Sequence, residues 1–441
     1  MSSDVVAEVA NDQVILVEAD PKPPHISPNT STIVRNTVVR AKKDKKPKHR
    51  RTPWTYFQVL TLGIILLFLI LACVIIETIS RLKFSEATWT EHTEDQKKHH
   101  IRIVDSVNAK NLGWTASYNR FASLASDEIF SSQHSMSDHN TLFLPKKSTK
   151  NELEDTEEHI NYLLKKDVSI PESFDARLKW PLCWSIHQIF NQAGCGSCWS
   201  VSSAAVMSDR ICIASNGTIQ KQISVNDLTS CCRNCGGCEG TEWALSAFSY
   251  WKSTGIVSGG SFGSGEGCRP YTKPPTCGGP CSSKYYDKKE TPSCTRTCQP
   301  LYGVKYEDDL SKASKVYWLR ANSLLIQQVY TDVTSRINQL LQNKTVEIIQ
   351  KDVLLHGPVL ACFSIYEDLQ HYKSGVYKLH KTYLVSELYG HCVRLLGWGI
   401  DPQSQKKYWL MANSWGRDFG ENGFFRMSFD EIPEEIVAGI P

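Results

Sequence analysis

The stretch Gln192–Trp199 has the sequence QAGCGSCW, and its second cysteine, Cys198, is followed by WSVSSAAVMSDRICIAS, a pattern typical of a helix with a small-residue face. A helix N-terminus carries partial positive charge and free N–H groups, and both favour a thiolate. Because the thiolate is the reactive form, Cys198 stands where a nucleophile is expected. An isolated cysteine at a helix start is more often structural. Two cysteines three residues apart, Cys195 and Cys198, can also form a redox or metal pair.

The same stretch resembles the signature of the papain-like cysteine peptidases, in which CGSCW is followed far downstream by His and Asn. His391 lies in YGHCVRLLGWG and Asn413 in ANSWGRDFGENGFF. The resemblance implies that His391 pairs with Cys198 as imidazolium and thiolate, later protonates the leaving amine, and is oriented by Asn413. It also implies an oxyanion hole made by the Gln192 side chain and the Cys198 backbone N–H, because developing negative charge needs fixed donors. Trp415 is expected to shield the hydrogen bond between Asn413 and His391.

Within that family the chain resembles cathepsin B over residues 101–441. The matching segments are IPESFDAR (Ile170–Arg177), SDRICI (Ser208–Ile213), CCRNCGGCEG (Cys231–Gly240), VSGG (Val257–Gly260), CRPYTKPP (Cys268–Pro275), YKSGVY (Tyr372–Tyr377) and VAGIP (Val437–Pro441). Upstream, VNAKNLGWTASYNRF (Val107–Phe121) is similar to the short inhibitory propeptide of cathepsin B, with Trp114 matching. That propeptide runs backwards through the cleft and blocks it. We therefore expect cleavage near Lys165–Ser169 to activate the enzyme and to free it from the membrane anchor that the sequence predicts further upstream.

The resemblance implies an α+β, papain-like two-domain fold, with a helical left domain that holds the nucleophile and an antiparallel, β-barrel-like right domain. The segments VLACFSIY (Val359–Tyr366), HCVRLLGWG (His391–Gly399) and KYWLMANSW (Lys407–Trp415) are β-rich and suggest antiparallel strands. The segment Arg320–Lys344 has apolar residues at helical spacing and predicts an amphipathic helix. A helix-rich half followed by a strand-rich half indicates an α+β arrangement.

Composition and charge exclude some classes of protein. The chain has 441 residues, is 41% hydrophobic and carries a formal net charge of +3. The apolar fraction argues against a mostly disordered chain, and the near-neutral balance argues against a nucleic-acid binder that works through bulk charge. Residues 1–53 contain ten Lys or Arg against six Asp or Glu, and we expect them to form a basic, disordered cytoplasmic tail.

The segment Phe57–Ile76, FQVLTLGIILLFLILACVII, contains no charged residue. Its twenty residues span about 30 Å as a helix, which matches the hydrocarbon core of a bilayer. Trp54 and Tyr56 lie where interfacial aromatic residues would anchor the helix. The sequence therefore predicts a transmembrane signal-anchor helix within residues 54–79, and a buried core helix is the alternative.

The eight Lys and Arg residues of Arg40–Arg51 are expected to stay cytoplasmic, which gives a single-pass type II orientation. Residues 80–169 are then a stalk and propeptide. Residues 170–441 are a peptidase domain on the lumenal or extracellular side, lysosomal or secreted after processing. Two lumenal sequons, at Asn216 and Asn343, predict N-glycosylation.

Sixteen cysteines indicate an oxidising compartment and a disulfide framework. The cathepsin B resemblance implies six pairs: Cys183–Cys212, Cys195–Cys238, Cys231–Cys294, Cys232–Cys235, Cys268–Cys298 and Cys277–Cys281. The spacing in CCRNCGGC is tighter than in the family, and a zinc site there is the alternative for Cys232 and Cys235. Cys73 lies in the predicted span. Cys362 and Cys392 remain, and they are either free buried thiols or a disulfide that narrows a substrate pocket.

The resemblance assigns substrate contacts to Gly196, Gly240, Thr241, Cys362, Cys392, Trp415 and Glu435. Cys362 and Cys392 line the pocket for the second residue before the scissile bond, and Glu435 matches an acidic residue that lets some family members accept Arg there. Thr241 replaces the second glycine of a pair that binds the substrate backbone. This change either weakens peptide binding or is tolerated with the side chain turned away.

Cathepsin B has an occluding loop in which two adjacent histidines bind the C-terminal carboxylate of the substrate. In this chain no histidine lies between Cys268 and Cys298, and a carboxylate needs a cationic or donor partner. Dipeptidyl-carboxypeptidase activity is therefore not expected. The sequence predicts a membrane-anchored cysteine endopeptidase zymogen that acts on peptides or proteins. It needs no cofactor or metal, does not bind nucleic acid and is open to cystatin-type inhibitors. The alternative is a weak or inactive cathepsin B-like binding or matrix protein.

Overall fold

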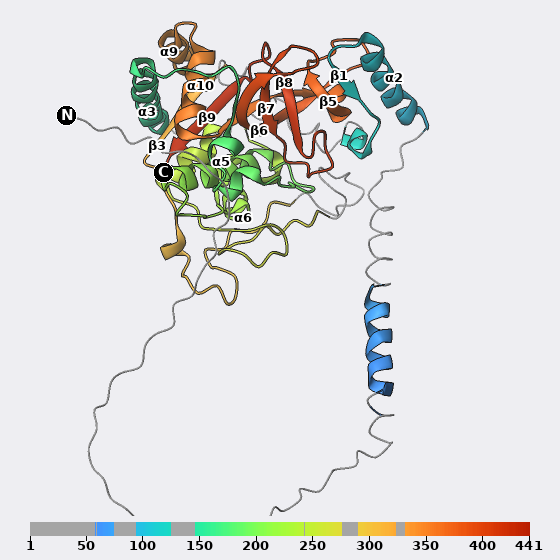
Figure 1. The fold of residues 1–441 in the computed structure, drawn as a ribbon. Coiled ribbons are helices and arrows are strands. Elements are labelled where there is room, and N and C mark those ends of the chain that lie inside the picture. Colours follow the sequence, from blue (N-terminus) through green and yellow to red (C-terminus); the bar gives the residue numbers. More distant parts are fainter. Residues whose placement is uncertain are drawn as a thin grey trace, which may run out of the picture. The chain divides into compact units, whose positions relative to one another are not determined.

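The structure is a computed structural model that describes residues 58, 60–74, 94–124, 146–241, 243–275, 290–322 and 331–441 (Figure 1). The chain divides into two units, Met1–Leu71 and Ala72–Pro441, which we describe separately. Residues 60–71 of the first unit are helical, and the helix continues to residue 74. No helix in the described residues is long and apolar enough to span a membrane. The predicted transmembrane helix Phe57–Ile76 is thus not supported by the described residues, and its two ends lie outside them.

The second unit is built on a sheet whose strands follow the order β1-β5-β8-β7-β6-β4-β9-β3, and β2 pairs with β6 off this path. The strands of the described chain are β1 (Trp114–Ala116), β2 (Phe174–Asp175), β3 (Lys315–Ala321), β4 (Val359–Tyr366), β5 (Tyr372–Tyr377), β6 (Glu387–Ile400), β7 (Lys407–Ala412), β8 (Phe424–Ser428) and β9 (Glu435–Ile440). The three strands expected from the β-rich segments are therefore confirmed as β4, β6 and β7. Their neighbouring pairs, β4 with β6 and β6 with β7, are antiparallel.

Helices cover this sheet (Figure 1). The α-helices of the described part are α2 (Glu94–Lys110), α3 (Lys146–Lys165), α4 (Ala176–Lys179), α5 (Cys198–Ala214), α6 (Val225–Cys231), α7 (Leu245–Ser253), α9 (Thr331–Leu341), α10 (Thr345–His356) and α11 (Glu367–Gln370). The short 3₁₀ helices are η1 (Arg120–Leu124), η3 (Trp184–His187), η4 (Arg233–Cys235), η5 (Gly237–Glu239) and η7 (Glu307–Asp309). The α+β class is confirmed.

Helix α5 is the predicted small-residue helix, and it is buried from Cys198 to Cys212. Small side chains let it lie close to the sheet, and two of its polar side chains bond to strand β6. Ser202 Oγ donates to the Cys392 carbonyl of β6 at 2.9 Å. Asp209 forms a fully buried ion pair with Arg394, also on β6, at 2.7 Å. Helix α5 is therefore fixed to the strand that carries His391.

The helix predicted over Arg320–Lys344 is shorter than expected. Arg320 and Ala321 end strand β3, residues 323–330 lie outside the described residues, and helix α9 covers only Thr331–Leu341. Pairing with β9 overrides the helical spacing at Arg320, because strand formation there completes the edge of the sheet. The predicted apolar face is present within α9, where Val333, Ile337 and Leu341 are buried.

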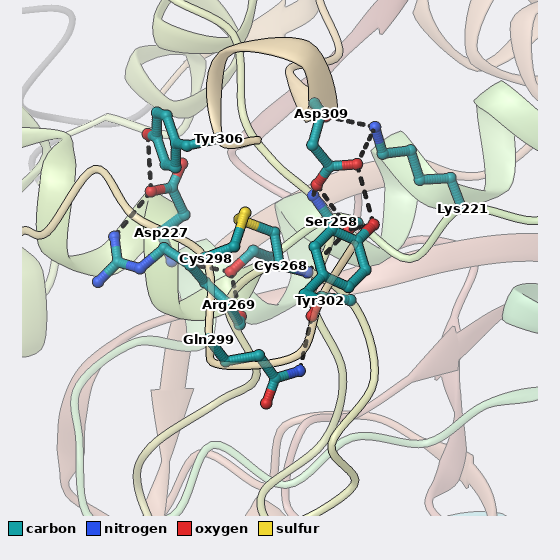
Figure 2. Close-up of a disulfide and its surroundings, with 12 residues drawn as sticks. Lys221, Asp227, Ser258, Cys268, Arg269, Cys298, Gln299, Tyr302, Tyr306 and Asp309 are labelled. Atoms are coloured by element: carbon teal, nitrogen blue, oxygen red, sulfur yellow. Dashed lines mark hydrogen bonds and ion pairs between the residues drawn. A yellow bond between two sulfur atoms is a disulfide. The ribbon is translucent and has the colours of Figure 1, made fainter. Parts of the chain in front are cut away.

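Five of the disulfides implied by the resemblance are formed: Cys183–Cys212, Cys195–Cys238, Cys231–Cys294, Cys232–Cys235 and Cys268–Cys298. Cys232 and Cys235 are bonded to each other, which argues against zinc on that pair. Cys277 and Cys281 lie outside the described residues. A further disulfide joins Cys362 and Cys392. In Figure 2, ion pairs of Arg269 with Asp227 and of Lys221 with Asp309 surround the Cys268–Cys298 disulfide.

Residues that precede the peptidase domain contact both ends of its sheet. At one end, β1 pairs with β5, and the buried Trp114 donates its Nε1–H to the Lys378 carbonyl at 3.1 Å. At the other end, helix α3 packs against the edge strand β3 (Figure 1). Residues 125–145, which connect these two parts, lie outside the described residues.

Candidate active site

Cys198 is the first residue of α5 and is a free thiol. Its own backbone N–H and those of Trp199 and Cys392 hydrogen-bond to the sulfur, and these contacts favour the thiolate. Burial has the larger effect and raises the pKa of Cys198 to about 11. In this closed form the cysteine is therefore a neutral thiol, although it lies at the helix N-terminus as expected. The contact with Cys392 also brings the residue after His391 against the sulfur.

His391 lies on β6 and is almost completely buried. Its Nε2 is 2.8 Å from Asn413 Oδ1. The same oxygen accepts the backbone N–H of Ser414 at 2.8 Å, which fixes the orientation of the amide. Since Oδ1 can only accept, Nε2 carries the proton and Nδ1 of the neutral ring is unprotonated. Nδ1 has no hydrogen-bond partner among the described residues, so it is available as a base.

Burial also controls the charge of the imidazole. It lowers the pKa of His391 to about 4, and the hydrogen bond to Asn413 opposes this only in part. Burial therefore favours a neutral imidazole and a neutral thiol for this pair. The ring of Trp415 lies 5.0 Å from that of His391 and is fully buried, as expected for a shield of the Asn413 contact.

The Gln192 side chain is held at both of its polar atoms. Ser414 Oγ donates to Gln192 Oε1 at 2.7 Å, and Gln192 Nε2 donates to the Cys195 carbonyl at 3.1 Å. An amide nitrogen carries two hydrogens, so the second can serve an oxyanion. The Tyr271 hydroxyl donates to the Gln192 carbonyl at 2.8 Å and contacts Ser197 Oγ at 2.9 Å. These contacts bring Gln192 and the start of α5 together.

Ser414 and Tyr271 were not predicted as site residues. Ser414 stands between Asn413 and Trp415, so three consecutive residues support the amide of Gln192 and the ring of His391. A hydroxyl that positions another side chain has no spacing signature, because its partner lies far along the chain. The separation of Ser414 from Gln192, for example, is 222 residues.

On the expected substrate-binding side, Gly196 donates its N–H to the Cys238 carbonyl at 2.9 Å and sets the turn before Cys198. Gly240 has a φ of +96°, which favours glycine. The Thr241 hydroxyl donates to the Trp243 carbonyl at 3.0 Å, so its side chain is engaged within the protein. This geometry corresponds to the tolerated alternative for Thr241.

The three residues expected at the pocket for the second residue before the scissile bond lie side by side on adjacent strands. Cys362 of β4 is opposite Cys392 of β6 on one side and opposite Glu435 of β9 on the other. Both oxygens of Glu435 accept hydrogen bonds, from the Ala244 N–H at 2.9 Å and the Trp318 Nε1–H at 3.0 Å. Burial raises the pKa of Glu435 to about 7. Its carboxyl group is thus already committed to protein donors.

The segment before the peptidase domain reaches the active-site loop through η1. The ring of Phe121 stacks on Trp415 with centroids 5.7 Å apart, and Arg120 forms an ion pair with Asp418. These contacts place the prosegment against the residue that covers His391. They are consistent with the buried, uncharged state of Cys198 and His391.

A separate buried group, His159, Asp352 and His356, has residue types that can ligate a metal. Asp352 Oδ1 accepts hydrogen bonds from Tyr317 at 2.8 Å and from His159 at 2.7 Å, and Oδ2 is paired with Arg210. A guanidinium bound to the same carboxylate repels a second cation. The group is therefore better explained as a hydrogen-bonded cluster than as a metal centre.

Comparisons with known proteins agree with this geometry. The papain family cysteine protease profile matches residues 170–434. The cathepsin B-like cysteine proteinase 1 of Ostertagia ostertagi is 42% identical over 282 residues, covering 63% of this chain and 74% of that protein. The cathepsin B-like cysteine proteinase 6 of Caenorhabditis elegans is 36% identical over 352 residues, covering 77% of this chain and 82% of that protein.

Among solved structures, procathepsin B S9 from Trypanosoma congolense has a TM-score of 0.52 and 27% sequence identity, covering 77% of this chain and 97% of that one. The chain belongs to the papain family of cysteine proteases and is a cathepsin B-like cysteine-type peptidase.

Proposed function

We propose that the chain is the zymogen of an endopeptidase in which Cys198 is the nucleophile, His391 the acid–base and Asn413 the residue that orients His391. The observation that carries this proposal is the pairing of His391 Nε2 with Asn413 Oδ1, which leaves Nδ1 free next to the strand residue that contacts the Cys198 sulfur. Gln192 and the Cys198 backbone N–H are the proposed oxyanion donors.

In the proposed reaction, the Cys198 thiol transfers its proton to His391 Nδ1, and the thiolate attacks the carbonyl carbon of the substrate. The carbonyl oxygen becomes an oxyanion that accepts hydrogen bonds from Gln192 Nε2–H and the Cys198 N–H. The imidazolium then protonates the leaving amine as the C–N bond breaks, which leaves a thioester. Water attacks the thioester and gives a proton to His391 Nδ1. That proton returns to the sulfur as the acid product leaves.

The alternative interpretation is a weak or inactive binding protein. Labelling at Cys198 distinguishes this alternative from an active enzyme. We expect an epoxide or vinyl-sulfone probe to label Cys198 in the acid-processed chain and to leave a Cys198→Ala variant unlabelled. Correctly processed chain that remains unlabelled would support the binding protein. The prosegment contacts of Phe121 make the unprocessed chain the matched negative control.

We propose cleavage of internal peptide bonds rather than removal of C-terminal dipeptides, because the segment between Cys268 and Cys298 contains no histidine to bind a terminal carboxylate. A peptide and its C-terminal amide should be cleaved at the same internal bond with similar kcat/KM. Efficient dipeptide release from the free acid alone would contradict this.

We further propose that the Cys362–Cys392 disulfide narrows the pocket for the second residue before the scissile bond, and that Glu435 does not recruit Arg there. Support comes from the register of the three residues and from the two donors bound to the Glu435 carboxyl group. A Cys362→Ala, Cys392→Ala double variant should accept large residues at this position better than the native enzyme does. The kcat/KM ratio of Phe to Ala substrates measures the effect, and an unchanged ratio would oppose it.

For location, we propose the tail at residues 1–53, the membrane anchor at 54–79, the stalk and propeptide at 80–169 and the lumenal peptidase domain at 170–441. The support is the uncharged segment, the basic run before it and the disulfide framework. We propose that the enzyme is lysosomal or secreted after processing and is inhibited by cystatin-type proteins.

The sequons Asn216 and Asn343 are exposed, as glycosylation requires. In sealed microsomes, the peptidase domain should resist added protease and shift in mass after deglycosylation, while the tail is digested. Digestion of the peptidase domain in intact vesicles would contradict the orientation.

A further inference from the structure

Helix α3 lies before the papain-family match that begins at residue 170, yet it is packed as part of the core of the peptidase domain. Ile160 and Leu163 are completely buried, and Thr156 and His159 lie on the same face and are buried as well. The helix contacts β3, α9 and α10. A prosegment that only blocked the cleft would not need this face.

Helix α3 completes the edge of the sheet. Strand β3 is the last strand in the sheet order, and an edge strand presents backbone donors that need partners. The Val316 N–H donates to Asp155 Oδ2 at 3.0 Å, and the Trp318 N–H donates to Thr156 Oγ1 at 3.2 Å. If α3 left, both donors would lose their partners.

The centre of the contact is a buried polar cluster. His159 Nε2 is 2.7 Å from Asp352 Oδ1, and the His159 ring stacks on Tyr317 with centroids 3.6 Å apart. Burial opposes ionisation of Asp352, but Arg210 and His159 more than offset it and hold the pKa of Asp352 well below its usual range. The carboxylate of Asp352 therefore stays charged in mild acid, so its contact with His159 of α3 is retained there.

Charged pairs surround this cluster. Glu157 pairs with Arg336 of α9 at 2.6 Å, and Glu158 pairs with Lys315 of β3 at 2.7 Å. The helix ends at Lys165, and Lys165 and Lys166 are exposed. The connection to the peptidase domain is thus open to proteases, while the helix before it is held by side chains.

We propose that α3 remains bound to the peptidase domain after the chain is cut between Lys165 and Ser169, so that the fragment that contains α3 stays with the processed enzyme as a non-covalent subunit. The surface formed by β3, α9 and α10 is its binding site, and the partner is this segment of the same chain. The proposal rests on the cleavage position of the proposed function, but it is tested without catalysis.

The experiment uses the full chain with Cys198→Ala, cut by a lysine-specific protease after Lys165 or Lys166 and run on size-exclusion chromatography at pH 5 and pH 7. We expect denaturing mass spectrometry of the peptidase peak to find the fragment that contains α3, in an amount nearly equal to that of the peptidase fragment, at both pH values. A peak that contains only the chain from residue 166 or 167 onward would overturn the proposal. Failure of the proposed catalytic function would leave this result unchanged.

The variant His159→Ala, made in the same background, should raise the unbound fraction of the α3-containing fragment at least tenfold, because it removes the side chain that hydrogen-bonds to Asp352 and stacks on Tyr317. The matched control is Asn161→Ala, which changes an exposed position of the same helix and should leave the peptide bound. If His159→Ala does not fold, amide hydrogen exchange of α3 is measured instead in the cut Cys198→Ala chain. Protected amides in residues 156–163 support retention, and exchange at the rate of a free peptide refutes it.

Discussion

The active-site residues differ in what determines their state. Asn413 fixes the tautomer of His391, because its oxygen accepts from both the imidazole and the Ser414 N–H. Burial fixes the charges, and it keeps Cys198 and His391 neutral in the closed form. Orientation is therefore complete before activation, whereas ionisation has to wait for water to enter the site. Removing the prosegment can then switch on the chemistry without rearranging Asn413 or Gln192.

Replacing Asn413 by Ala should lower kcat/KM by about tenfold to hundredfold, equivalent to about 1.4 to 2.7 kcal/mol of transition-state stabilisation. The physical reason is that His391 Nε2 loses the Asn413 Oδ1 acceptor and the ring can rotate away from the base position. Steady-state kinetics of processed enzyme measures the effect, which should fall mainly on kcat. A change confined to KM would contradict an orienting role.

Alkylation should report the charge state of Cys198 directly. In the intact zymogen, the pKa of about 11 means that the thiolate fraction is small at pH 6 and grows as the pH rises toward that value. The processed enzyme should react readily at pH 6, because solvent relieves the burial of both partners and permits the ion pair. The measurement is the pH profile of iodoacetamide labelling at Cys198 before and after processing. Equal rates at pH 6 would show that burial does not control this thiol.

At the scale of elements, prediction succeeded where the pattern is local. Helix α5 and strands β4, β6 and β7 follow from the periodicity of their own residues. Helix α3 does not, because the face it buries mixes Thr156 and His159 with few apolar residues. Its partner Asp352 lies 193 residues from His159, and only the folded chain brings the two together. The proposed catalytic residues could be linked from the sequence because a family motif joins them across similar distances.

The attachment of α5 to β6 should be a major source of stability. Replacing Arg394 by Ala removes the ion-pair partner of the buried Asp209, which keeps only its hydrogen bond from Ser185 among these two contacts, and should destabilise the domain by about 3 to 5 kcal/mol. Denaturant unfolding measures the loss. The matched control is Lys378→Ala at the exposed pair with Asp430, where we expect a change of no more than about 1 kcal/mol. Similar losses in the free energy of unfolding in both variants would argue that the buried pair stabilises the domain no more than the exposed pair does.

At the scale of the whole molecule, the peptidase domain and the segment before it form one folded unit. The resemblance anticipated a blocking propeptide in which Trp114 matches the family, and the structure places Trp114 in a buried position beside β5. It did not anticipate contacts at both ends of the sheet, because those depend on which residues of the proregion meet which edge. Six disulfides in the described chain add covalent links within the peptidase domain.

A chain that starts at Ile170 should fold poorly compared with one that starts at Glu94. It lacks β1 beside β5 and the α3 side chains that bind the N–H groups of Val316 and Trp318. We expect a lower refolding yield, measured as monomer on size-exclusion chromatography after oxidative refolding. Adding a peptide of residues 146–165 should raise the yield of the short chain. Equal yields without the peptide would contradict this dependence.

The contact of α3 with the edge strand β3 has a consequence for self-association of the protein. Exposed strand edges are where sheets of different molecules join and where aggregation begins. While α3 is in place, it binds the N–H groups of Val316 and Trp318 on β3, so these two donors are not open to a strand of another molecule. We therefore expect the chain to aggregate less readily when α3 is bound to β3 than when α3 is missing.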